Sequence, residues 1–131
     1  MTDTVERAIG EAESWLISAK DKLSLAENDE VEATVCCSLA IHSIIRVNDS
    51  LTLNFMKVKA TRHDDASALF AKMLQQGKIS SGNKRFVRLI QTAMADKSGA
   101  DYGNGTFSYE DAKRYVEEAE DFIAMAKGVL K

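Results

Sequence analysis

The chain has 131 residues, of which 45 % are hydrophobic and 28 % charged, with a formal net charge of −3 at pH 7 and no proline. This composition excludes a disordered or low-complexity chain and is typical of one globular domain, which we expect to span residues 1–131. No stretch approaches the roughly 18 apolar residues of a membrane span, so we expect no membrane partner.

The amino-terminal segment and the cysteines indicate the cellular compartment. The first 13 residues are rich in acids and contain no apolar run, which argues against a secretory signal. Cys36 and Cys37 are adjacent, and on a helix their side chains diverge by about 100°, so we expect them to pack as small apolar residues. We therefore predict a reduced, cytoplasmic protein.

The stretch from Glu30 to about Asn54 predicts a central helix that is apolar around most of its circumference. One stripe at helical spacing comprises Ala33, Cys36 or Cys37, Ala40, Ile44, Val47 and Leu51, and a second comprises Val35, Leu39, His42 and Ile45. Neighbours must cover both stripes, either within the chain or across an oligomer interface.

Apolar residues recur at threes and fours through the rest of the chain, without strand-like alternation. The expected segments are a first helix from Thr2 or Asp3 to about Glu27, a third that begins at Asp64 or Asp65 and ends before Gly77, a fourth from Ser80 or Ser81 to about Asp96, a glycine-rich loop over 98–107, and a last helix from Ser108. Because proline is absent, the helices are uninterrupted. We predict an all-α, up-and-down bundle of four long helices and one short helix.

Positive charge is concentrated in the middle of the chain. Residues 57–88 contain eight Lys and Arg against two Asp, a net charge of +6, so the remainder carries −9. Lys84, Arg85 and Arg88 occupy the first turns of the fourth helix, where the helix dipole disfavours cations. We expect their positive charge to be compensated either by an acid from another helix or by a phosphate group. With Arg62, these residues form the predicted anion-binding or nucleic-acid-binding site.

Four further residues are candidates for contact with a ligand or partner: His42, His63, Asp101 and Tyr102. His42 is either a base or ligand at a dimer groove or a hydrogen-bonded core or interface histidine. His63 precedes Asp64 and Asp65, but adjacent ligands on a helix point apart and the Asp pair is expected to cap the third helix. We therefore expect no metal site, and we expect no cofactor.

Three stretches carry a resemblance to a known family. They are Ala33 to Leu51 with His42, Lys59 to Leu69 with His63, and Ala100-Asp101-Tyr102-Gly103 followed by Ser108 to Leu130. In this order they are similar to the HEPN family of nucleotide-binding domains, specifically its small stand-alone prokaryotic members. The resemblance implies a helical bundle that usually forms a homodimer, often beside or bound to a minimal nucleotidyltransferase as in toxin–antitoxin pairs.

The resemblance also bears on catalysis. Catalytic HEPN members are ribonucleases that use an Arg followed four to six residues later by a His, in which His moves the 2′-hydroxyl proton and Arg holds the phosphate charge. The matching segment here, from Lys97 to Tyr102, contains neither residue type. The expected function is therefore non-catalytic binding of a nucleotide, an RNA or a nucleotidyltransferase. The alternatives are a ribonuclease toxin with a displaced active site and a purely structural interaction module.

Overall fold

The computed structural model describes residues 2–103 and 105–131, and within this part of the chain the side chains of Asp3 and His63 are not described. It contains α1 (Asp3–Leu23), α2 (Glu30–Met56), α3 (His63–Gln75), a single 3-10 turn η1 (Ser81–Asn83), α4 (Arg85–Tyr102) and α5 (Tyr109–Val129). The prediction of an all-α bundle with four long helices and one short helix is confirmed. Among the described residues, no helix has the length and apolar character that crossing a bilayer requires.

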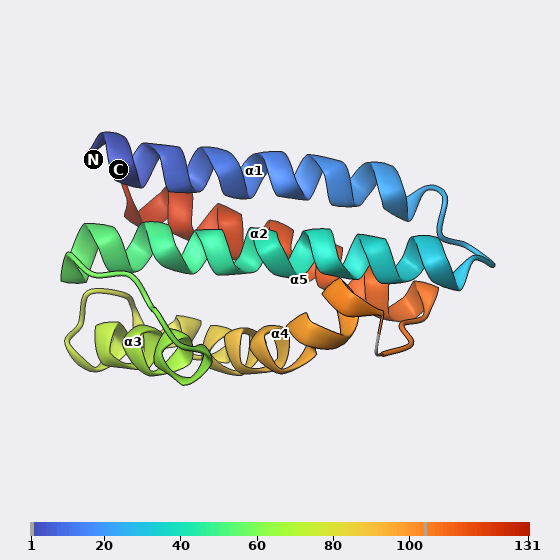
Figure 1. Ribbon diagram of the computed structural model, residues 1–131. Coiled ribbons are helices and arrows are strands. Elements are labelled where there is room, and N and C mark those ends of the chain that lie inside the picture. Colours follow the sequence, from blue (N-terminus) through green and yellow to red (C-terminus); the bar gives the residue numbers. More distant parts are fainter. Residues whose placement is uncertain (1, 104) are drawn as a thin grey trace.

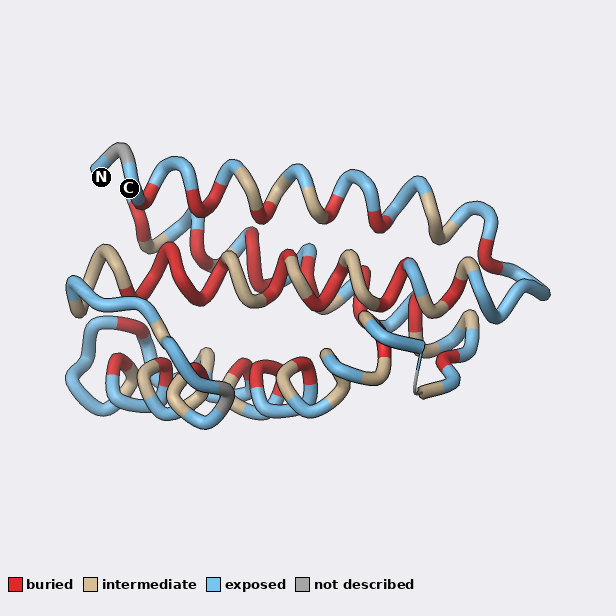
Figure 2. Tube along the Cα trace, viewed as in Figure 1, coloured by how far each residue is buried: buried red, intermediate tan, exposed pale blue. Residues whose placement is uncertain are grey.

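Helix α2 is the centre of the bundle and contacts every other α-helix (Figure 1). Its first stripe is buried completely, with Ala33, Ala40, Ile44, Val47 and Leu51 each 0 % exposed, and it appears as the red face of α2 in Figure 2. The second stripe is only partly covered within one chain, because Leu39 and Ile45 are half-buried and Val35 is 37 % exposed.

The other helices cover α2 with apolar faces. Helices α1 and α2 run antiparallel, as the short connection between them predicts, and α5 packs against both. The apolar face of α5, from Ala112 to Ala126, is buried, and so is Leu130 immediately after the helix. Phe122 of α5 stacks on Phe86 of α4 at 4.8 Å between ring centroids, and Phe70 of α3 meets Phe122 edge to face at 5.8 Å. This aromatic contact joins α3, α4 and α5.

Four predicted boundaries are wrong. Helix α4 begins at Arg85, after the 3-10 turn η1, instead of at Ser80 or Ser81. Helix α1 ends at Leu23 instead of near Glu27, because residues 24–29 close into tight turns that bury Ala26. Helix α3 begins at His63 with Arg62 as its N-cap residue, so Asp64 and Asp65 lie in its first turn, where the helix dipole still favours acids.

Helix α4 continues to Tyr102, past the predicted end near Asp96. The helix stops at Gly103, which takes the left-handed conformation with φ 72°. Gly99 lies inside this extension, and a side chain there would meet the backbone of Gly105 at 3.4 Å, where the loop folds back onto the helix. Asp101 and Tyr102 are therefore helical residues on the last turn of α4.

Candidate functional site

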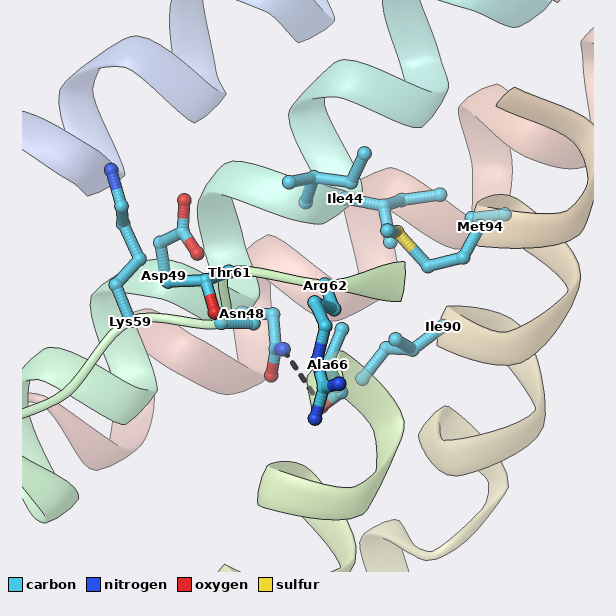
Figure 3. A pocket seen from close by; sticks show the side chains of 12 residues that line it. Ile44, Asn48, Asp49, Lys59, Thr61, Arg62, Ala66, Ile90 and Met94 are labelled. Carbon is cyan, nitrogen blue, oxygen red and sulfur yellow. Dashed lines mark hydrogen bonds between the residues drawn. The ribbon is translucent and has the colours of Figure 1, made fainter. Parts of the chain in front are cut away.

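A cavity of about 210 Å³ lies where the middle of α2 meets the 57–62 segment, α3 and α4. Helix α2 ends at Lys57, which takes the left-handed conformation with φ 58° and turns the chain back toward the bundle. We call this hollow the Asn48 cavity (Figure 3); its lining residues are Ile44, Ile45, Asn48, Asp49, Lys59, Ala60, Thr61, Arg62, Ala66, Ile90, Ala93 and Met94.

The Asn48 cavity combines an apolar wall with cations at its edge. Ile44, Ile90 and Met94 supply apolar side chains from α2 and α4, whereas Lys59 and Arg62 come from the connecting segment and are exposed. Arg62 makes only a long ion pair with Asp65, at 3.5 Å, and its side chain is 83 % exposed. Such a rim attracts an anion, and the apolar wall favours a flat or apolar group behind it.

Two polar side chains of α2 are buried in the wall of this cavity. Asn48 is 2 % exposed and its Nδ2 donates to the carbonyl oxygen of Ala66 at 3.1 Å. Asp49 accepts a hydrogen bond from Arg46 Nη1 at 2.7 Å, and Arg46 Nε donates in turn to Glu11 of α1 at 3.2 Å. Burial raises the pKa of the Asp49 carboxyl, although its bond with Arg46 opposes the rise.

A second polar group, the Asp101 cluster, comprises Ser38, His42, Lys97 and Asp101. The carboxylate of Asp101 lies against α2, where Ser38 Oγ donates to Oδ1 and His42 Nε2 is 3.2 Å from the same oxygen. Lys97 Nζ donates to Oδ2 at 2.9 Å. Burial would raise the pKa of Asp101, but the hydrogen bonds from Ser38 and Lys97 outweigh it and hold the pKa below its ordinary value.

The structure therefore brings together His42 and Asp101, two of the predicted contact residues, from positions 59 apart in the chain. Trp15 of α1 stacks on the His42 ring, with 4.8 Å between centroids and 21° between planes. Ser38 and His42 both bond the same Asp101 oxygen, so they do not form the Ser–His–Asp relay of a hydrolase. The cluster therefore links α2 to α4, and Trp15 adds a contact from α1 to the half-buried His42 ring.

Tyr102 and His63 complete the predicted contact residues. Tyr102 follows Asp101 at the end of α4 and is 74 % exposed. The backbone of His63 begins α3, but its side chain lies outside the described residues. Among the described residues, no three His, Cys, Asp or Glu side chains gather as a metal ion requires.

The predicted basic site is divided between two places. Arg62 lines the Asn48 cavity, whereas Arg85 and Arg88 line a shallow hollow between α4 and α5 together with Arg114 and Glu118. Arg85 pairs with Asp121 of α5 at 3.5 Å, so an acid from another helix compensates this cation. Lys84 is exposed immediately before α4, and among the described residues neither it nor Arg88 forms an ion pair.

Sequence reasoning missed the polar wall of the Asn48 cavity. Asn48 and Asp49 are consecutive polar residues inside the most apolar helix of the chain, and that interruption was the available signal. Lys59 is not among the predicted site residues, because the path of the connecting segment is a tertiary property.

Comparison with known proteins assigns this chain to no family. No protein-family model matches this sequence, and no curated protein matches it.

Proposed function

We propose that this protein is a non-catalytic, HEPN-like helical bundle that binds a nucleotide or the end of an RNA in the Asn48 cavity. The observation that carries this proposal is that the Asn48 cavity is lined both by the exposed cations Lys59 and Arg62 and by apolar side chains. Phosphate groups are bound by such cations, and bases are bound by apolar surfaces. The absence of an Arg-x4-6-His motif from the sequence supports binding without cleavage.

The Asn48 cavity supports this function better than the surface near Arg85 does. The hollow around Arg85, Lys113 and Arg114 also contains Glu110, Glu117, Glu118 and Asp121, whose charges repel phosphate. Among the described residues that line the Asn48 cavity, Asp49 is the only carboxylate, and it is buried and paired with Arg46. Binding through Lys59 and Arg62 therefore meets less electrostatic opposition.

The proposal is tested by titrating the protein with a fluorescent mononucleotide and a short labelled single-stranded RNA at low and moderate salt. Substituting both Lys59→Gln and Arg62→Gln should weaken binding by about tenfold or more and reduce its salt dependence. The matched control is Lys84→Gln with Arg88→Gln, which removes the same charge outside the cavity and should leave affinity within about twofold. No binding by wild type at low salt would overturn the proposal and favour a purely structural module.

The homodimer, the nucleotidyltransferase partner and the cytoplasmic location belong to the same proposal. Val31 and Val35 are exposed on α2, and Val35 belongs to its half-covered second stripe. An apolar surface of this kind suits a protein partner. Light scattering after gel filtration tests the dimer directly. A monomer at micromolar concentration would remove self-association from the proposal.

The Asp101 cluster favours one alternative, a ribonuclease with a displaced active site. His42 is oriented by Asp101 and lies near Lys97, and a positioned histidine beside a cation is able to move protons next to a phosphate. The RNA in the same titration is examined for shortening on a gel. Cleavage that is lost in His42→Ala would establish this alternative, whereas intact RNA at high protein concentration supports binding alone.

A further inference from the structure

The orientation of the Asn48 amide is determined by its neighbour. Nδ2 donates to the carbonyl oxygen of Ala66 at 3.1 Å, the bond drawn in Figure 3. Exchanging the nitrogen and oxygen would place two acceptors against each other, so this contact identifies which atom is Oδ1. Oδ1 is buried, and none of the described residues donates a hydrogen bond to it.

An enclosed carbonyl oxygen without a donor is unfavourable, and in native proteins such a group is uncommon and calls for a specific explanation. Asn48 lines the cavity, so a ligand that displaces part of the lining would be able to donate to Oδ1. Oδ1 is shielded from solvent in the present arrangement. Ligand binding must therefore shift part of the lining, and the 83 % exposed Arg62 side chain is the one that reorients most easily.

The electrostatics of the cavity set the direction in which a nucleotide enters. The lining contains two acceptors, the buried carbonyl of Asn48 and the carboxylate of Asp49, which is paired with Arg46. The exposed cations Lys59 and Arg62 extend away from each other at the edge of the cavity (Figure 3). A phosphate is repelled from Asp49 and attracted to the rim. A base that carries N–H groups is complementary to the inner wall.

The size of the cavity limits the ligand to a single nucleotide. Its volume of about 210 Å³ is below the roughly 300–1,000 Å³ of ordinary small-molecule sites. One heteroaromatic base fits behind the rim, and a run of stacked nucleotides does not. The apolar wall from Ile44, Ile90 and Met94 matches the faces of such a base.

We propose that the Asn48 cavity takes a single 5′-nucleotide unit with its base inward, where a base N–H group donates to Asn48 Oδ1, and with its phosphate at the exposed edge, where the side chains of Lys59 and Arg62 turn toward it. This inference rests on the proposed function and makes it more specific. The protein then recognises a free mononucleotide or one terminal nucleotide, and it reads the hydrogen-bond donors of the base.

The test is calorimetric titration of wild-type protein with adenosine 5′-monophosphate, purine riboside 5′-monophosphate and adenosine. The second ligand lacks only the amino group, and the third lacks only the phosphate. We expect each deletion to weaken binding by about tenfold. In Asn48→Leu the amino group should no longer matter, so the first two ligands should bind equally.

The outcomes separate this inference from the proposed function. Equal binding of the two monophosphates to wild type overturns the donor contact but leaves nucleotide binding intact. Failure of both monophosphates to bind overturns both. Because the two ligands are compared on wild-type protein, the test stands even if Asn48→Leu does not fold, and Asn54→Leu on the same helix outside the cavity is the matched control.

Discussion

Replacing Asp101 by Asn tests whether the Asp101 cluster stabilises the bundle through its charge. The substitution keeps the shape of the side chain but removes the carboxylate that Lys97 contacts at 2.9 Å and that also accepts from Ser38. Hydrogen bonds to charged groups contribute about 1.5–3 kcal/mol each. Solvent screening reduces the contribution of Lys97, whose side chain is 27 % exposed.

We therefore expect Asp101→Asn to lower the free energy of unfolding by about 2 kcal/mol at pH 7, which corresponds to a fall in Tm of about 8 °C for a chain of this size. The measurement is urea denaturation followed by circular dichroism. Asp21→Asn is the matched control, because Asp21 is exposed on α1 and forms no ion pair among the described residues.

The pH dependence provides a second criterion. The pKa of Asp101 is below its ordinary value of 3.8 in the folded protein, so the carboxylate stabilises the fold above that value. This stabilisation is lost as the pH falls through the folded-state pKa. The difference between wild type and Asp101→Asn should thus be complete near neutral pH and shrink in strongly acidic solution. Equal stability at pH 7, or a deficit that is the same at pH 7 and pH 3, would refute the reasoning.

Three further predictions concern the core and the helix ends. Ala40→Asp should lower the free energy of unfolding by more than about 3 kcal/mol, because Ala40 is 0 % exposed and the new charge has no partner. The control is Ala124→Asp, at an exposed position of α5. An unchanged melting temperature of Ala40→Asp would show that the register of α2 is wrong. Ser108→Ala should cost about 1 kcal/mol in urea denaturation, since it breaks the capping box of α5, and a neutral result would contradict that role. Cys37 should resist a thiol reagent in the native protein at pH 8, because burial raises its pKa to about 12; rapid labelling without denaturant would show that the core opens there.

The sequence alone determined the number, order and buried faces of the helices. These properties follow from apolar spacing within single segments, and that pattern is local. In the last helix, the apolar residues at helical spacing from Ala112 to Ala126 form one buried face. The capping residues of the same helix were also readable, because a cap is formed by neighbours three positions apart.

The tertiary structure alone decided which polar residues meet. Asp101 is held on the last turn of α4 through contacts with Ser38 and His42, about 60 positions earlier in the chain, and no local pattern encodes that pairing. The Asn48 cavity likewise forms only because the 57–62 segment folds back over α2 and α4. Helical periodicity specifies which face a residue occupies, whereas contacts between distant segments specify what that face meets.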